Sequence, residues 1–131
     1  MKPTTREWVE KAEGDWTIVQ REWKSRKPVY DAVCFHPQQC VEKYLKALLE
    51  EYGRYVAKTH SIAVLIEKCE PGLVVPDEMK KELKVLTFYA VSYRYPGESA
   101  NRQETKEAIE IVKRFGIFIR EHLQISGKRL I

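Results

Sequence analysis

The sequence predicts an all-α fold, an up-and-down bundle of four long helices and one short helix. Apolar residues recur at helical spacing in five segments, and no segment alternates long enough to predict a strand. Glycine and proline fall between the segments, so the loops are short and consecutive helices run antiparallel. The length of 131 residues, with 44% hydrophobic and 32% charged side chains, is typical of one globular domain over residues 1–131.

The first two predicted helices are long and amphipathic. The five helices cover about residues 5–23, 31–52, 59–69, 77–95 and 99–125. In the first, the apolar side chains that step by three or four are Trp8, Ala12, Trp16, Val19 and Trp23. Thr4 or Thr5 can cap this helix. The second helix ends at Gly53, which can adopt the positive φ of a helix end, and Pro37 inside it predicts a kink or a helix restart.

Polar caps and helix breakers bound the last three helices. Thr59 or Ser61 can cap the short third helix, and Asp77 can cap the fourth. The fourth helix stops at Pro96-Gly97. Residues 126–131, which begin with Ser-Gly, end the fifth helix and are expected to form a frayed tail.

Composition and spacing exclude several classes of protein. The net charge of +4 arises within residues 54–131, and it is too small for a dedicated DNA-binding surface. Three cysteines make no disulfide framework and predict reduced thiols. No histidine or cysteine spacing suits a zinc or di-iron site, so we expect no metal and no cofactor. The sequence also has no signal peptide and no membrane-spanning segment, which predicts a cytoplasmic protein.

One candidate binding surface lies on the predicted second helix. His36, Gln39, Lys43 and Lys46 step by three, four and three, so they form one polar-to-basic stripe. Imidazole, amide and ammonium groups can bind a phosphate or a base. The alternative interpretation is a solvated helix face with no ligand.

A second candidate surface lies where the predicted fourth helix ends. Tyr93 and Tyr95 flank Arg94, and Arg102 follows at the start of the fifth helix. The guanidinium group matches a phosphate, and tyrosine rings can stack on bases. The alternative interpretation is a structural ion pair between Arg94 and Glu98.

Three segments carry a resemblance to a known family: FHPQQCVEKYLKALL at residues 35–49, THSI at 59–62 and RYPG at 94–97. In this order they resemble the second-helix signature, the start of the third helix and the Arg-Tyr-Pro turn of the HEPN family, small helical proteins of bacteria and archaea. The resemblance spans about residues 5–125. It implies a helical bundle that is usually dimeric and often pairs with a small nucleotidyltransferase from a neighbouring gene.

The resemblance also implies nucleotide binding and, in some branches, metal-independent RNA cleavage. The cleaving branches carry an arginine, a polar residue directly after it, and a histidine after four to six intervening residues. Here Tyr95 follows Arg94, and the candidate histidine positions hold Ser99, Ala100 and Asn101. Without an imidazole at this place, proton transfer near pH 7 lacks its usual agent. We therefore assign no catalytic residue; the sequence leaves enzymatic activity open and favours a protein that is not an enzyme.

Three functional hypotheses follow. The preferred one is a non-catalytic nucleotide- or RNA-binding homodimer, partnered with a small nucleotidyltransferase in a toxin–antitoxin-like system. The others are a metal-independent ribonuclease toxin with a displaced histidine, and a purely structural protein-interaction bundle. An excess of aromatic residues predicts the homodimer, with its interface on the fourth and fifth helices around Arg94. These aromatic residues are Trp8, Trp16, Trp23, Phe88, Tyr89, Tyr93, Phe115 and Phe118.

Overall fold

The computed structural model describes residues 1–124. This range contains five α-helices, joined by loops, and no strand. The helices are α1 (Pro3–Trp23), α2 (Tyr30–Glu51), α3 (Ile62–Cys69), α4 (Asp77–Ser92) and α5 (Arg102–His122). The predicted all-α fold class and the order of four long helices and one short helix are confirmed. None of the helices in this range is long and apolar enough to cross a membrane.

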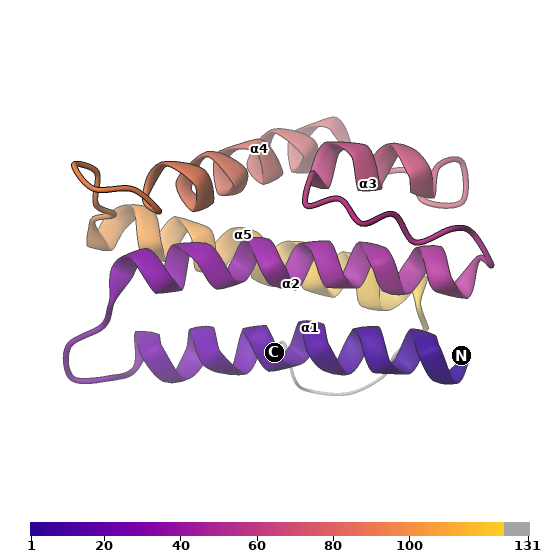
Figure 1. The fold of residues 1–131 in the computed structure, drawn as a ribbon, viewed down its shortest axis with the longest axis horizontal. Helices are drawn as coiled ribbons and strands as arrows, with labels where there is room; N and C mark the ends of the chain where they lie inside the picture. Colours follow the sequence, from indigo (N-terminus) through magenta and orange to yellow (C-terminus); the bar gives the residue numbers. More distant parts are fainter. Residues whose placement is uncertain (125–131) are drawn as a thin grey trace.

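Helix α2 lies at the centre of the molecule and packs against each of the other four helices. Figure 1 shows α1 antiparallel to α2 on one side, and α3 with α4 on the other side. Helix α5 runs behind α2 and also packs against α4. The C-terminal half of α2 is accordingly almost fully buried, and its side chains form the middle of the core.

Of the kink or helix restart predicted at Pro37, the restart does not occur. Helix α2 continues without interruption from Tyr30 to Glu51, and Pro37 is buried within it. Proline removes one backbone donor and disfavours a helix interior. Here the packing of α2 against four helices outweighs that local cost, because most helix stability in proteins comes from tertiary burial.

The helix starts are only partly as predicted. Ser61 caps α3 by accepting a hydrogen bond from the Val64 N–H at 3.2 Å, as predicted. The expected threonine cap of α1 is wrong, because Lys2 is the N-cap and makes no side-chain cap bond. The hydroxyls of Thr4 and Thr5 instead donate to the Glu50 and Glu51 carboxylates at 2.7 and 2.9 Å, and so tie α1 to the end of α2.

Two further helix boundaries differ from the prediction. Asp77 is the first residue of α4 rather than its cap, and Pro76 occupies the cap position. Helix α5 begins at a capping box, in which the side chains of Asn101 and Glu104 each accept from the other residue's backbone N–H. It ends at His122, short of the predicted end near residue 126. The predicted frayed tail, residues 126–131, lies outside the described residues.

Fewer aromatic side chains are exposed than the dimer prediction assumed. Trp16 and Phe115 are fully buried, and most of the remaining rings pack against the core. Those partly buried rings are Trp8, Trp23, Tyr89, Tyr93 and Phe118. Only Phe88 of the predicted set is exposed, with 60% of its surface accessible. The core of the bundle therefore takes up most of the aromatic side chains whose number had suggested a dimer interface.

All three cysteines are buried and free, so we predict that they are unreactive in the folded protein. Burial raises the pKa of Cys34 and of Cys69 to about 11, and it raises the pKa of Cys40 well above the usual value. At pH 8 only about one Cys34 thiol in a thousand is then ionised, and the thiolate is the reactive form. An aromatic disulfide reagent should label fewer than one thiol per chain in minutes, and all three in guanidinium chloride. Rapid labelling of the folded protein would contradict this burial.

Candidate anion-binding site

A buried carboxylate on α1 holds two predicted site residues on α2. Asp15 is largely shielded from solvent, and its Oδ1 lies 3.0 Å from Nδ1 of His36. Its Oδ2 accepts a hydrogen bond from Nζ of Lys43 at 2.6 Å. His36 and Lys43 are seven residues apart, or about two helical turns, so both face α1. One carboxylate therefore fixes the positions of an imidazole and an ammonium group.

The bond to Asp15 also decides which nitrogen of His36 is open. An ionised carboxylate can only accept, so Nδ1 of His36 carries the hydrogen and donates it. In the neutral tautomer that this bond favours, Nε2 is the nitrogen with the free lone pair. Among residues 1–124 no group hydrogen-bonds to Nε2, and the side chain is partly exposed. His36 thus presents one polar atom to solvent from a fixed ring.

Phe35 connects His36 to Arg94. The Phe35 and His36 rings meet edge to face, with their centroids 5.8 Å apart. The guanidinium carbon of Arg94 lies 5.2 Å from the centroid of the same Phe35 ring. The five residues Arg94, Phe35, His36, Asp15 and Lys43 therefore form one continuous series of contacts, which we term the Arg94–Lys43 row. It joins the end of α4 to α2 and α1.

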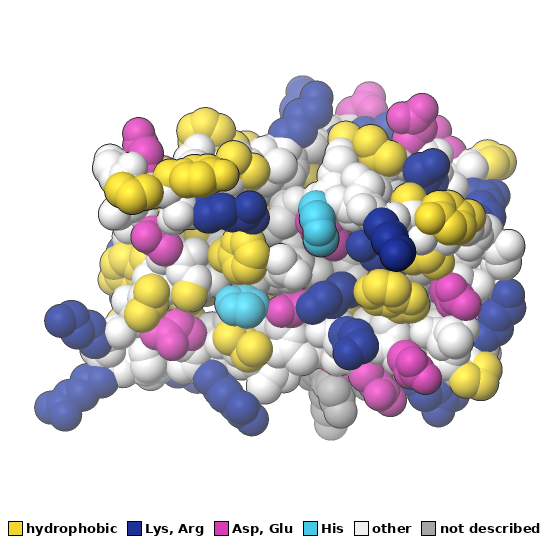
Figure 2. Space-filling model, in the orientation of Figure 1, with side chains coloured by type: hydrophobic (Ala, Val, Ile, Leu, Met, Phe, Trp, Pro, Cys, Tyr) yellow, Lys and Arg dark blue, Asp and Glu magenta, His cyan; other side chains and the backbone are white. Residues whose placement is uncertain are grey.

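The Arg94–Lys43 row borders open surface. A hollow of about 280 Å³ adjoins it, with Phe35, Tyr93 and Arg94 on its walls and Ala90 behind them. Asp31 also lines this hollow, but its carboxylate accepts from the Ala100 N–H at 2.8 Å. Figure 2 shows one histidine side chain where α1 lies beside α2 and a second nearer to the start of α3, with lysine, arginine and hydrophobic side chains on the same face.

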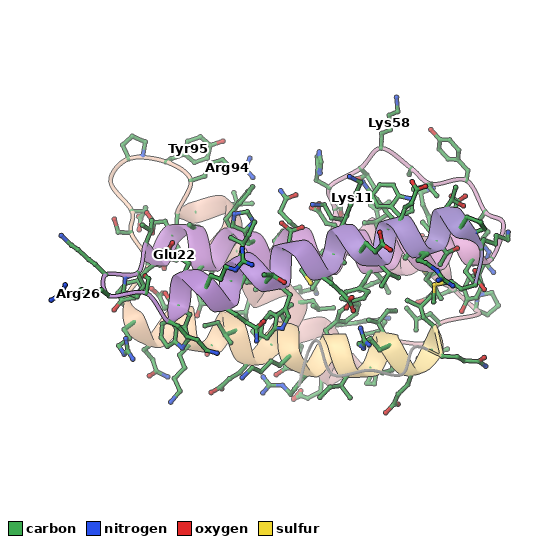
Figure 3. All side chains as sticks on the ribbon, turned by 90° about the horizontal axis from the view of Figure 1, so that it is seen from below. Lys11, Glu22, Arg26, Lys58, Arg94 and Tyr95 are labelled. Carbon is green, nitrogen blue, oxygen red and sulfur yellow. The ribbon has the colours of Figure 1, made fainter. Side chains whose placement is uncertain are left out.

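Arg94 is free of the acidic partner that the alternative interpretation required. Among residues 1–124 it makes no ion pair, with Glu98 or with any other carboxylate. Figure 3 shows Arg94 and Tyr95 projecting from the same edge of the molecule, beside the loop that joins α4 to α5. Tyr95 is exposed, and its ring is open for contact with a ligand.

Tyr93 has a different position from Tyr95. Its ring stacks on Tyr89 with centroids 5.8 Å apart, and its hydroxyl donates to Glu104 at 2.5 Å. The hydrogen bond to the Glu104 carboxylate, together with desolvation, raises the pKa of Tyr93 to about 12. Tyr93 therefore stays neutral near pH 7, and it lines the hollow together with Arg94.

The remaining predicted residues are further from the row's contacts. Gln39 follows His36 by one turn of α2 and is partly exposed. Lys46 is 9% exposed, and its ammonium group lies 5.6 Å from the centroid of the Trp8 ring, so this end of the stripe is covered by α1 rather than solvated. Arg102 lies over the Trp23 ring at 4.6 Å, at the end of α1. The structure shows no contact of Lys46 or Arg102 with the row.

The second histidine candidate forms a separate polar cluster. Nδ1 of His60 lies 3.3 Å from the buried Glu42 carboxylate, and the Gln38 amide donates to Glu42 at 3.3 Å. The Thr87 hydroxyl is 3.0 Å from the Gln38 carbonyl oxygen. This cluster attaches the α2–α3 loop and α4 to α2. His36 is therefore the histidine that shares a contact with Arg94.

Sequence reasoning missed Asp15 and the role of Phe35. An aspartate inside the first predicted helix, adjacent in sequence to a core tryptophan, was the available signal for Asp15. It also missed a buried cluster in which Arg120 of α5 and the Tyr44 hydroxyl both bind the Glu13 carboxylate. No group of three or more possible metal ligands occurs within residues 1–124.

Comparisons with known proteins agree with this fold. A family model described as the HEPN domain matches residues 5–122. The chain is similar to the crystal structure of TT1696 from Thermus thermophilus, with 26% identity and a TM-score of 0.79 over 92% of this chain and 99% of that one. It is also similar to ST0689, an archaeal HEPN homologue, with 25% identity and a TM-score of 0.67 over 94% and 99% of the two chains. No curated protein sequence matches. The match over nearly the whole chain shows that this protein belongs to the HEPN domain family.

Proposed function

We propose that this protein is a non-catalytic nucleotide- or RNA-binding module of the cytoplasm that works as a homodimer. The observation that carries the proposal is the Arg94–Lys43 row. It offers an unpaired guanidinium, a fixed imidazole nitrogen and an ammonium group along one face, beside the exposed ring of Tyr95. Cations suit phosphates, and an aromatic face suits a base.

The positions of the cations favour a ligand with more than one phosphate or with a phosphate and a base. Lys43 is already ion-paired with Asp15, whereas Arg94 makes no ion pair with any of residues 1–124, so its guanidinium donors are available to a ligand. Phe35, His36 and Asp15 lie between the two ends of the row, Arg94 and Lys43. A single inorganic phosphate can contact only one end. A nucleotide or a short RNA can contact both.

The direct experiment is a titration of fluorescently labelled single-stranded RNA, followed by anisotropy at several salt concentrations, with unlabelled nucleotides as competitors. We expect binding that weakens as salt rises, because phosphate contacts release counterions. Absence of binding to RNA and to nucleotides at low salt would contradict the proposal and favour the purely structural bundle.

Lys43→Ala should weaken RNA binding and lower its salt dependence. Loss of one phosphate contact reduces the slope of log K against log salt by about 0.7 for a single strand. The matched control is Lys24→Ala, which removes an exposed charge at the end of α1 and should leave the slope unchanged. An unchanged slope in Lys43→Ala would place Lys43 outside the binding site.

A second candidate function, metal-independent RNA cleavage, is favoured by one observation. The Asp15–His36 pair leaves Nε2 open, which is the arrangement of a general base. Nε2 would take the proton of a 2′-hydroxyl, whose oxygen attacks the adjacent phosphorus and expels the 5′-oxygen, which is protonated by water. Cleavage in excess chelator that yields 2′,3′-cyclic ends, and that is lost in His36→Ala, would establish this function. RNA that stays intact in this assay would contradict cleavage and favour the non-catalytic binding module.

We predict a homodimer that forms through the outer face of α4. Phe88 and Val91 lie three residues apart on α4, and 60% and 53% of their surfaces are exposed. Exposed large apolar side chains that share one helix face are typical of an interface. Sedimentation at micromolar concentration should show twice the 15.4 kDa monomer mass, and Phe88→Glu should shift it to the monomer. A wild-type monomer would contradict the prediction.

We also propose a small nucleotidyltransferase as a protein partner, in a toxin–antitoxin-like system. Membership of the HEPN domain family supports this proposal. Co-purification with the product of a neighbouring nucleotidyltransferase gene, at a fixed stoichiometry, tests it. A mixture of the two purified proteins that elutes as separate components would contradict it.

A further inference from the structure

A half-enclosed hollow of about 390 Å³ lies between α3 and α4 and shares no residue with the Arg94–Lys43 row. Its floor consists of the buried side chains of Ile62, Ile66 and Leu83, with Ala63 at its rim. This volume falls within the range of small-molecule sites, roughly 300–1,000 Å³. Ala63 lines the hollow and is exposed, so a large side chain at this position would reduce the space within it.

The two ends of this α3–α4 hollow differ in charge. Helix α3 runs antiparallel to α4, so Ser61 at the start of α3 lies towards Thr87 and Lys84 on α4 (Figure 1). The Ser61 oxygen accepts from the Val64 N–H, and within residues 1–124 its hydroxyl hydrogen donates to no protein group, so it can donate to a ligand. Lys84 is exposed and makes no ion pair with any residue of the range 1–124. This end therefore offers an ammonium group and a hydroxyl donor.

The opposite end of the hollow is unfavourable for an anion. Lys80 is paired with Glu70 at 3.6 Å, so its charge is matched. Glu67 adds a further carboxylate to the lining and makes no ion pair within residues 1–124. A ligand with a negative head would accordingly enter with the head towards Lys84 and its apolar body over the Ile62–Leu83 floor.

We propose that the α3–α4 hollow is a second ligand site, which binds a small amphipathic carboxylate with an apolar body the size of a medium-length acyl chain. Three features carry the proposal: the apolar floor, the donors at the Lys84 end and the acidic opposite end. The apolar floor alone would bind any apolar molecule of suitable size. The donors at one end and the carboxylates at the other favour a molecule with a single negatively charged group at one end.

The test compares three eight-carbon probes, octanoate, octanol and octylamine, by methyl and amide NMR titration of the full chain. We expect octanoate to shift the signals of Ile62, Ile66 and Leu83 saturably, and to bind more tightly than octanol and octylamine. Octylamine binding as tightly as octanoate, or no saturable shift at these residues with any probe, would overturn the proposal.

Two variants and one control sharpen the test. Ala63→Trp places a ring over the hollow and should abolish binding, while the exposed position of Ala63 leaves the fold intact. Lys84→Ala should raise the octanoate Kd by about two- to fivefold without changing octanol binding, as expected for an exposed charge contact. Lys81→Ala, an exposed lysine of α4 outside the hollow, should change neither. Unchanged octanoate binding in Ala63→Trp would show that the ligand sits elsewhere.

Discussion

Arg120→Met is expected to lower the free energy of unfolding by about 3–5 kcal/mol, the largest effect of any single change outside the apolar core. Arg120 of α5 and Glu13 of α1 form an ion pair in which both side chains are more than nine-tenths buried. The Tyr44 hydroxyl of α2 donates to the same Glu13 oxygen at 3.2 Å. Removal of the Arg120 guanidinium leaves the buried Glu13 carboxylate without its cationic partner. Of the two groups named here, the neutral Tyr44 hydroxyl alone then still binds it.

Arg114 provides the matched control, because it lies on the same helix and pairs with Glu82 across to α4. The Arg114 side chain is 49% exposed, so Arg114→Met should cost less than about 1 kcal/mol. The double variant Glu13→Gln/Arg120→Met should recover part of the loss, because no buried charge remains unmatched. Urea unfolding followed by circular dichroism measures all three. Equal losses for Arg120→Met and Arg114→Met would contradict the role of the buried pair.

Arg94→Ala is expected to raise the dissociation constant for RNA or nucleotide by about ten- to a hundredfold, since a charge-assisted hydrogen bond contributes about 1.5–3 kcal/mol. The same change should alter the free energy of unfolding by less than about 1 kcal/mol, as is usual for an exposed charge. Arg94 is exposed, makes no ion pair in the described range and rests on Phe35 through a cation–π contact. Arg94→Ala is therefore expected to reduce binding strongly while changing stability little.

Arg102→Ala is the matched control for Arg94→Ala. Both arginines are exposed and each rests on an aromatic ring, Phe35 for Arg94 and Trp23 for Arg102. Arg102 makes no contact with the Arg94–Lys43 row, so its loss should leave binding within about twofold of wild type. Binding by Arg94→Ala that equals wild type, or unfolding of that variant, would contradict the proposed site.

The fold was predictable from the sequence because its signals are local. Helical spacing of apolar residues, the Ser61 cap and the positive φ of 69° at Gly53 follow from neighbouring residues alone. Of the two outcomes predicted at Pro37, the helix restart does not occur, because continuity at this position depends on the four helices that pack on α2. The ends of α4 and α5 were likewise placed too late, since helix ends respond to tertiary contacts and fray easily.

The candidate site was only half predictable. The stripe on α2 indicated His36 and Lys43, and the Arg-Tyr-Pro turn indicated Arg94. The carboxylate that orients the first two belongs to α1, 21 residues before His36 in sequence, and no local pattern links Asp15 to that stripe. The contact of His36 and Arg94 through Phe35 depends on how α4 ends beside α2. Long-range pairing of this kind requires the structure.

The most direct test of the Arg94–Lys43 row is an NMR titration of the full chain with a short single-stranded RNA and with a nucleoside triphosphate. We expect the largest shifts at the Arg94 guanidinium, the Phe35 ring and Nε2 of His36, with Nδ1 of His36 still bonded to Asp15. Signals of Arg102 at the end of the bundle should stay unchanged. Saturable shifts centred on Arg102, or on any surface without Arg94 and His36, would contradict the account.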